Sequence, residues 1–185
     1  MLFGPTQFTL PHLVEAPETL YLLQYSTWGH HSLAFYRDKH LVEFTYGDWA
    51  LFALNKRDTW TAVSHMLFPT LGALGRKVVE WQPNDPIPPL FVDCIQAQPF
   101  QADGSQVTFL FDELTQAFES QIEHQVFHEE DGVWFVPYSV PYGFWNNCNH
   151  ELAKWLVKLG GKVSGRVFWN PDFIAGIQPY RSNHR

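Results

Sequence analysis

The stretch YGFWNNCNHELAKWLVKLGG, from Tyr142 to Gly161, combines a turn-like run of asparagines with a strong helix pattern. Leucine and tryptophan recur at three- and four-residue spacing between Asn149 and Leu159, and the two glycines that follow are a typical helix stop. This pattern predicts an amphipathic helix over 149–159. Cys148 stands directly before it, so the sequence places a thiol at a helix start.

A thiol in this position has two chemical advantages. The first backbone N–H groups of a helix have no partner inside the helix, and the helix dipole adds partial positive charge. Both stabilise the thiolate of Cys148, which is the reactive form, and the same N–H groups can receive an oxyanion. Asn146, Asn147 and Asn149 add capping and amide groups nearby. The alternative is a structural thiol, which is the commoner role of a lone cysteine near a helix start.

A β-hairpin is predicted upstream, over HSLAFYRDKHLVEFTYGD. HSLAFY and HLVEFTY are its strands, and RDK, residues 37–39, is its turn. In the second strand the odd-numbered residues face one way and the even-numbered residues the other. With the turn at 37–39, we expect His31 on the first strand and Glu43 on the second to lie across from each other.

This hairpin supplies the partners that a thiol nucleophile needs. A catalytic thiol requires a base, and the base requires an acceptor that orients it. His31 is the predicted base, with its neighbour His30 as the alternate. Glu43 is the predicted orienting carboxylate. Asp48 is the second candidate for that role, although Gly47-Asp48 is more typical of a turn or a helix cap.

The same residues resemble a known family. A histidine at a strand start (HHSLAFY), an acid on the next strand (LVEFTYGDW) and an asparagine-flanked cysteine opening a helix (NNCNHELAKWL) follow one another along the chain. This order resembles the circularly permuted branch of the papain-like NlpC-type thiol hydrolases, which includes the lecithin–retinol acyltransferase-like proteins. The stretches EFTYGDW and NNCN–LAKWL–GG are most similar to an uncharacterised bacterial family of that superfamily. The resemblance covers Leu22–Gly47 and Tyr138–Gly161. It implies Cys148 as nucleophile, His31 as base and Glu43 as third polar residue.

Aromatic residues make up 17% of the chain, and several flank the proposed site residues in sequence. They predict a substrate groove, although most aromatic side chains of a globular protein lie in its core. The predicted groove residues are the aromatic side chains of Tyr25, Trp28, Tyr46, Tyr142 and Trp145, and the amide of Asn147.

Length and charge bound the remaining possibilities. The chain has 185 residues, 45% of them hydrophobic, which suits a single domain over 1–185; the proline-rich loop Pro83–Pro89 is the best internal boundary. The formal net charge is −7 without a basic stripe, which argues against a nucleic-acid partner. The N-terminal residues lack the pattern of a signal peptide, and no uncharged apolar run is long enough to span a membrane, so we expect a cytoplasmic protein.

Apolar periodicity predicts the other elements. Strands are predicted at 19–26, 76–82, 90–98, 133–140 and 166–169, and helices at 49–60, 61–68 and 106–125.

His124 and His128 stand four apart on a segment expected to be helical, a spacing that can place two imidazoles on one metal. A third ligand is not evident in the sequence, so a metal-dependent enzyme is only an alternative.

We therefore expect an α+β domain with a permuted papain-like core, in which a small antiparallel sheet packs against the helix that begins at Cys148. The expected function is that of a cysteine-dependent hydrolase or acyltransferase that needs no metal or organic cofactor. The leading substrate class is an amide in a peptide or cell-wall peptide, and a lipid ester is the second. The alternative is a non-catalytic domain that binds a peptide or another ligand.

Overall fold

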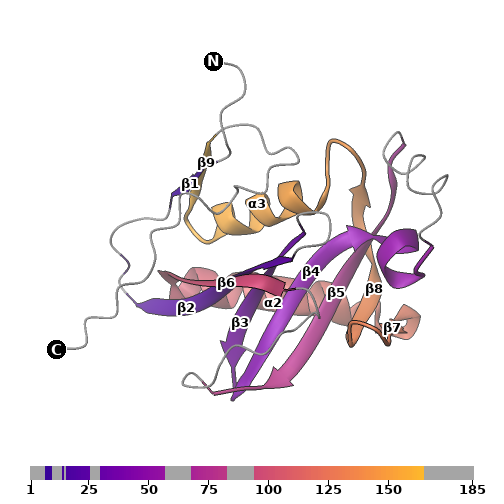
Figure 1. Ribbon diagram of the computed structural model, residues 1–185. Helices are drawn as coiled ribbons and strands as arrows, with labels where there is room; N and C mark the ends of the chain where they lie inside the picture. Colours follow the sequence, from indigo (N-terminus) through magenta and orange to yellow (C-terminus); the bar gives the residue numbers. More distant parts are fainter. Residues whose placement is uncertain are drawn as a thin grey trace.

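The computed structural model of the protein describes residues 7–9, 14, 16–25, 30–56, 68–82 and 94–164. Within these ranges the chain forms an α+β fold with a seven-stranded antiparallel sheet, a two-stranded sheet and two α-helices (Figure 1), which confirms the predicted class. In chain order the elements are β1 (Gln7–Thr9), β2 (Pro17–Tyr25), β3 (His31–Arg37), β4 (His40–Asp48), the π-helix η2 (Trp49–Ala53), β5 (Thr70–Glu80), β6 (Cys94–Asp103), α2 (Gly104–Glu119), the 3-10 helix η3 (Ile122–His124), β7 (Val126–His128), β8 (Val133–Tyr142), α3 (Cys148–Lys158) and β9 (Lys162–Ser164).

Several sequence predictions fall outside the described residues. They are Trp28 of the predicted groove, the loop Pro83–Pro89, residues 57–60 and 61–67 of two predicted helices, residue 26 and residues 90–93 of two predicted strands, and the whole strand predicted at 166–169. In the part of the chain that the structure describes, the helices lack the length and apolar composition that a membrane crossing requires.

The large sheet has the strand order β6-β2-β3-β4-β5-β8-β7, and every neighbouring pair is antiparallel. An antiparallel sheet was predicted, but this one is larger than the small sheet expected. β3 and β4 lie near its centre, and His31 at the start of β3 pairs with Gln24 of β2. β1 and β9 pair separately, beside the end of α3 (Figure 1).

The central hairpin turns over two residues, not the three predicted. Arg37 still pairs with His40, which leaves only Asp38 and Lys39 in the turn, with φ of 49° and 66°. Two successive positive φ values are typical of a type I′ turn, the geometry that best matches the twist of paired strands. Removing one residue from the turn shifts the pairing, and a shift of one residue moves a side chain to the other face of the sheet.

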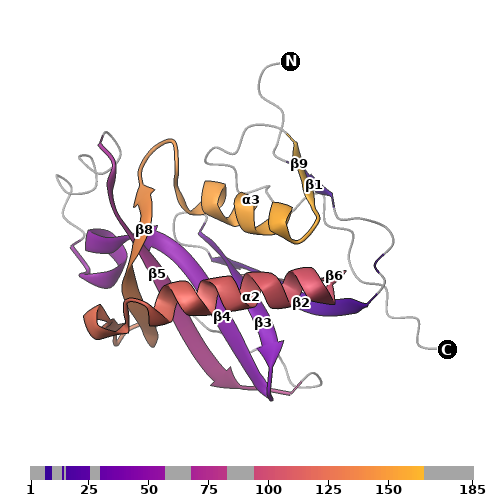
Figure 2. The same cartoon turned by 180° about the vertical axis from the view of Figure 1, so that it is seen from behind.

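The two faces of the sheet have separate apolar cores. α2 and α3 both cover one face, called here the helix face, and Figure 2 shows α2 running across the strands there. The predicted alternation in the second hairpin strand is confirmed, because Phe44 packs toward the helix face and Leu41 toward the opposite face. The helices contribute Val107, Leu110, Leu114, Phe118, Leu152, Trp155, Leu156 and Leu159 to the helix-face core.

The predicted helix over 149–159 is confirmed as α3, which starts one residue earlier, at Cys148. Its start is defined by Asn147, whose side-chain oxygen accepts hydrogen bonds from the backbone N–H groups of Asn149 and His150 at 3.1 and 3.3 Å. The His150 ring bonds back to the Asn147 backbone and completes a capping box. The helix stops before Gly160, whose φ of 82° favours glycine.

Candidate functional site

The ends of two distant elements bring Cys148 and His31 together. Cys148 is the first residue of α3 and His31 is the first residue of β3. Oδ1 of Asn149 lies 3.1 Å from Nδ1 of His31 and 4.0 Å from Sγ of Cys148. The predicted thiol and the predicted base are therefore neighbours, joined by the amide oxygen of the residue that follows the cysteine.

Packing explains why these three side chains meet. His31 projects from the helix face of the sheet, as Leu33 two residues later does, and only 1% of it is exposed. The apolar stripe of α3 packs on β3 and β4, which brings the start of the helix over the start of β3. The N-cap at Asn147 then determines where the first helical turn begins, and so where Cys148 and Asn149 lie.

The thiol has an environment in which two effects compete. Cys148 is partly buried, and burial raises the pKa of its thiol to about 11. The backbone N–H groups of Asn149, Cys148 and His31 act in the opposite direction, since they favour the thiolate. Burial has the larger effect, so the thiol of the free protein is protonated at neutral pH. The backbone at the helix start favours the thiolate, as expected, but this effect is smaller than that of burial.

Glu43 lies on the other face of the sheet and does not contact His31. In the hairpin register Ala34 pairs with Glu43 and Leu33 with Phe44, so Glu43 points away from the helix face. Its carboxylate accepts hydrogen bonds from the hydroxyl of Tyr25, at 2.6 Å, and from the hydroxyl of Ser32. The predicted role of Glu43 in orienting His31 is therefore wrong, because the hairpin turn is one residue shorter than expected.

Asn149 occupies the position that was expected for Glu43. It is buried and holds Nδ1 of His31 from the same helical turn that carries the thiol. Sequence reasoning treated Asn149 only as a source of capping and amide groups. An amide directly after a cysteine at a helix start was the available signal, but its partner lies 118 residues away.

The two alternates considered for the base and the carboxylate have other roles. His30 is buried near the opposite face, where Nε2 lies 2.5 Å from Oγ1 of Thr45 and the ring packs on Phe52 with centroids 5.3 Å apart. Asp48 caps η2, as its turn-like context indicated, and accepts a hydrogen bond from the backbone N–H of Leu51 at 2.9 Å. Hence His31, and not His30, faces the thiol.

The predicted groove residues do not form one groove. Tyr25 packs near Glu43 on the opposite face, and Asn147 is the buried cap of α3. Tyr46 is buried under α3, where its hydroxyl donates to the Val140 carbonyl at 3.3 Å and accepts from an Asn146 side chain. Tyr142 and Trp145 line one pocket, and 76% of Trp145 is exposed.

The metal alternative loses its structural basis. α2 ends at Glu119, so His124 belongs to η3 and His128 to β7, and the two imidazoles do not share a helix face. Nδ1 of His128 lies 2.9 Å from a carboxylate oxygen of Asp131. In the described ranges, no cluster of three or more histidine, cysteine, aspartate or glutamate side chains is arranged to hold a metal.

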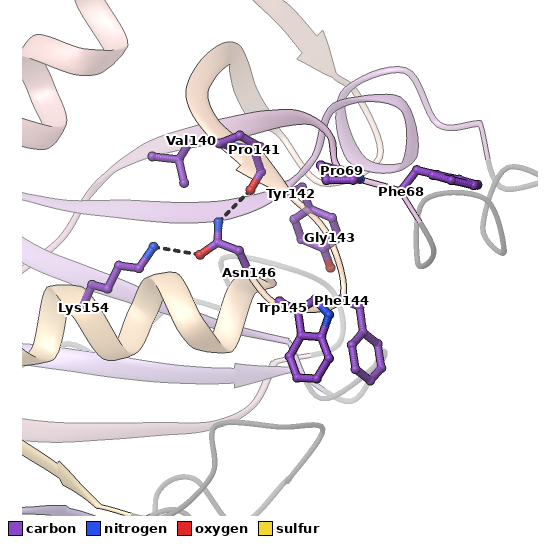
Figure 3. A pocket seen from close by; sticks show the side chains of 10 residues that line it. All are labelled: Phe68, Pro69, Val140, Pro141, Tyr142, Gly143, Phe144, Trp145, Asn146 and Lys154. Atoms are coloured by element: carbon purple, nitrogen blue, oxygen red, sulfur yellow. Dashed lines mark hydrogen bonds between the residues drawn. The ribbon is translucent and has the colours of Figure 1, made fainter.

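An apolar pocket of about 670 Å³ opens beside the start of α3 (Figure 3). Phe68 and Pro69 lie on one side of it, Phe144 and Trp145 on another, and Asn146 faces it from the turn before the helix. This turn is closed by backbone hydrogen bonds between Gly143 and Asn146, at 3.2 and 3.0 Å. Trp145 is thus presented to solvent by a short, doubly bonded turn two residues before the helix.

No family model, curated protein or solved structure was found to match this chain.

Proposed function

We propose that the protein is a cysteine-dependent hydrolase or acyltransferase that acts on an amide bond in a peptide-like substrate, with a lipid ester as the second substrate class. The single observation that carries the proposal is the shared contact at Asn149 Oδ1, which lies 3.1 Å from Nδ1 of His31 and 4.0 Å from Sγ of Cys148. A cysteine opening a helix that packs on a histidine-bearing strand also supports a permuted papain-like core of the NlpC type.

The proposed reaction starts with attack by Cys148 on the substrate carbonyl. As the carbon–sulfur bond forms, the thiol proton passes to the His31 ring and the carbonyl π electrons move to oxygen. The backbone N–H groups around the sulfur receive the resulting oxyanion. When the tetrahedral intermediate collapses, the carbon–nitrogen bond breaks and His31 returns its proton to the leaving amine.

The acyl-enzyme is then released by a second attack. Water gives its proton to His31 while its oxygen bonds to the acyl carbon, and the carbon–sulfur bond breaks as the proton returns to sulfur. Another nucleophile in place of water would make the same cycle an acyl transfer. Asn149 acts as a positioning residue, because its oxygen holds the ring of His31 rather than contacting the reacting carbon.

The raised pKa of the thiol argues against a preformed thiolate–imidazolium pair, so the proposed attack requires general-base assistance from His31. A thiol with a pKa of about 11 is ionised in only about one molecule in ten thousand at pH 7. Without help from His31, Cys148 should therefore react far more slowly than an ordinary thiol. With His31 acting as a general base, Cys148 should react faster than expected from its thiolate fraction alone.

Alkylation by iodoacetamide tests the proposal, with the rates at Cys148 and Cys94 read by peptide mass spectrometry between pH 5 and 10. We expect Cys148 to label at pH 7 at least as fast as Cys94, and His31→Ala to slow Cys148 by about tenfold or more. His30→Ala is the matched control, because that ring lies near the opposite face. Slow labelling of Cys148 that His31→Ala leaves unchanged would end the catalytic proposal.

A non-catalytic ligand-binding domain is the second candidate, and the raised pKa of Cys148 is the observation that favours it. A structural thiol is normally buried and protonated. This candidate predicts that Cys148 labels only as the pH approaches 11, whichever residue occupies position 31. The same alkylation series therefore separates the two functions.

A further inference from the structure

The pocket beside α3 is lined mainly by apolar side chains that the fold leaves uncovered. Trp145 is 76% exposed and Phe68 is 68% exposed, although both are large aromatic residues. Phe144 meets Trp145 edge-on, with ring centroids 5.0 Å apart. The volume of about 670 Å³ lies in the range of small-molecule sites. Clustered exposed aromatics around a cavity are typical of a binding site.

The charge at the rim of the pocket is already balanced. Lys154 reaches the pocket from α3, and its Nζ donates to the Asn146 side chain at 2.7 Å and to the Glu151 carboxylate at 2.8 Å (Figure 3). Glu151 is buried, so this ion pair is partly shielded from water. A charged ligand group would have to displace one of these partners. The pocket therefore favours an uncharged apolar group.

The pocket adjoins the segment that carries the thiol, because its lining residues Gly143–Asn146 are followed directly by Asn147 and Cys148. Tyr142 lines the pocket, and both Tyr142 and Cys148 pack against the helix-face core. Negative charge on Cys148 is one of the influences that raise the pKa of Tyr142, after burial, so the phenol and the thiol are electrostatic neighbours. A group seated against Trp145 therefore lies near the start of the helix that carries the thiol.

We propose that this pocket binds a large uncharged apolar group of the substrate that Cys148 attacks, so that the protein prefers substrates with such a group close to the scissile bond. This inference rests on the proposed function and specifies its substrate class. The apolar group is aromatic or aliphatic. Two kinds of substrate can supply it, namely a peptide through one of its side chains, or a fatty acyl amide or ester through its hydrocarbon chain.

Binding to the Cys148→Ala protein tests the pocket without turnover. The probes are N-acetyl-glycinamide, N-acetyl-phenylalaninamide and octanamide, titrated by calorimetry or NMR. Burial of an aromatic side chain is worth roughly a tenfold to hundredfold gain in affinity. We expect the phenylalanine probe, the octanoyl probe or both to bind at least about tenfold more tightly than the glycine probe. The tighter of the two identifies the source of the apolar group, and equal binding of all three overturns the proposal.

Two variants locate the bound probe. Trp145→Ala should weaken binding of the tighter probe by about tenfold. Trp134→Ala is the matched control, since Trp134 is also an exposed tryptophan but lies at the other end of β8, where it packs on Phe127. Loss of binding in Trp134→Ala but not in Trp145→Ala would overturn the assignment of the site. Circular dichroism of each variant confirms that the comparison is made between folded proteins.

Protection of the thiol links the pocket to Cys148. A saturating apolar probe should slow alkylation of Cys148 in the wild-type protein by several-fold and leave Cys94 unchanged, because it occupies the approach beside Tyr142. Unchanged labelling of Cys148 would overturn the proposed link. The ratio of rates with and without probe does not depend on how the thiol is activated. Failure of this inference is therefore distinguishable from failure of the proposed function, which is read from the effect of His31→Ala.

Discussion

Replacing Glu43 by glutamine should make the protein more stable at alkaline pH. Glu43 is 1% exposed and its two hydrogen-bond donors, Tyr25 and Ser32, both contact Oε1. Burial therefore raises the pKa of its carboxyl group from 4.5 to about 7, and the hydrogen bonds and the charge of Lys77 offset only part of this effect. Glutamine keeps an acceptor oxygen and removes the buried charge.

The sign and size of the effect follow from linkage. The folded state binds the Glu43 proton more tightly than the unfolded state, so the stabilising contribution of the protonated carboxyl is complete below pH 4.5 and is lost as the pH rises through about 7. A shift from 4.5 to about 7 corresponds to about 3 kcal/mol in the free energy of unfolding. At pH 8.5, Glu43→Gln should therefore exceed the wild type by up to about 3 kcal/mol.

Urea denaturation at pH 4, 5.5, 7 and 8.5 measures this difference. The two proteins should be closest at pH 4 and should separate as the pH rises. Glu123→Gln is a matched control, because Glu123 is exposed on η3 and should give no such separation. A constant difference across the series, or a wild type that gains stability relative to Glu43→Gln as the pH rises, would refute the reasoning. Alkylation of Cys148 should be unaffected by Glu43→Gln, since this carboxyl lies on the opposite face.

Three further pairs of substitutions test the site and the core. Asn149→Ala should slow alkylation of the Cys148 thiol at pH 7 about as much as His31→Ala does. Asn149→Asp keeps a hydrogen-bond acceptor and should slow alkylation less. Equal rates in the wild type and in Asn149→Ala would show that the amide does not position the His31 ring. Asn147→Ala should lower the free energy of unfolding by about 1 kcal/mol in urea, and Asn147→Asp should not, because only the former removes the helix cap. Trp155→Ala should lower the free energy of unfolding by about 3–5 kcal/mol, because Trp155 is buried. Trp145→Ala should change it by no more than about 0.5 kcal/mol, because Trp145 is exposed. Similar losses in the two variants would contradict this difference in burial.

Sequence reasoning was most successful where the local signals agreed. The α3 helix was predicted to within one residue because Asn147, the apolar stripe and the glycines after Leu159 all mark the same boundaries. The position of the thiol at the helix start followed from these boundaries, whereas its pairing with His31 was predicted from the chemistry of a thiol nucleophile and from the resemblance. Local capping chemistry acts within a few residues, so it can be recognised without knowledge of the tertiary structure.

The role assigned to Glu43 failed for a reason that the sequence hid. Its face depended on whether the hairpin turn contains two residues or three, and RDK lacks the glycine or asparagine that usually marks a two-residue turn. Asp38 and Lys39 adopt positive φ values nonetheless. The contact between His31 and Asn149 was equally hidden, because only the packing of α3 on β3 brings them together.

The length of β5 was underestimated because its first half is rich in glycine, which is depleted in strands. The structure explains why glycine is needed there. A Cβ atom at Gly75 would lie 2.5 Å from Cγ2 of Thr45, and one at Gly72 would lie 2.2 Å from the Val140 carbonyl oxygen. The close approach of the neighbouring strands β4 and β8 therefore requires glycine inside β5. Strand propensity alone predicts that the strand does not extend through these glycines.

The distance along the chain between the two halves of the site has a consequence for biosynthesis. His31 leaves the ribosome long before Asn149, its partner 118 residues later. At ordinary rates of translation this interval is on the order of ten seconds. All the strands of the large sheet precede Cys148 and Asn149 in the chain, so the contact between Asn149 and His31 can form only after that sheet has been synthesised.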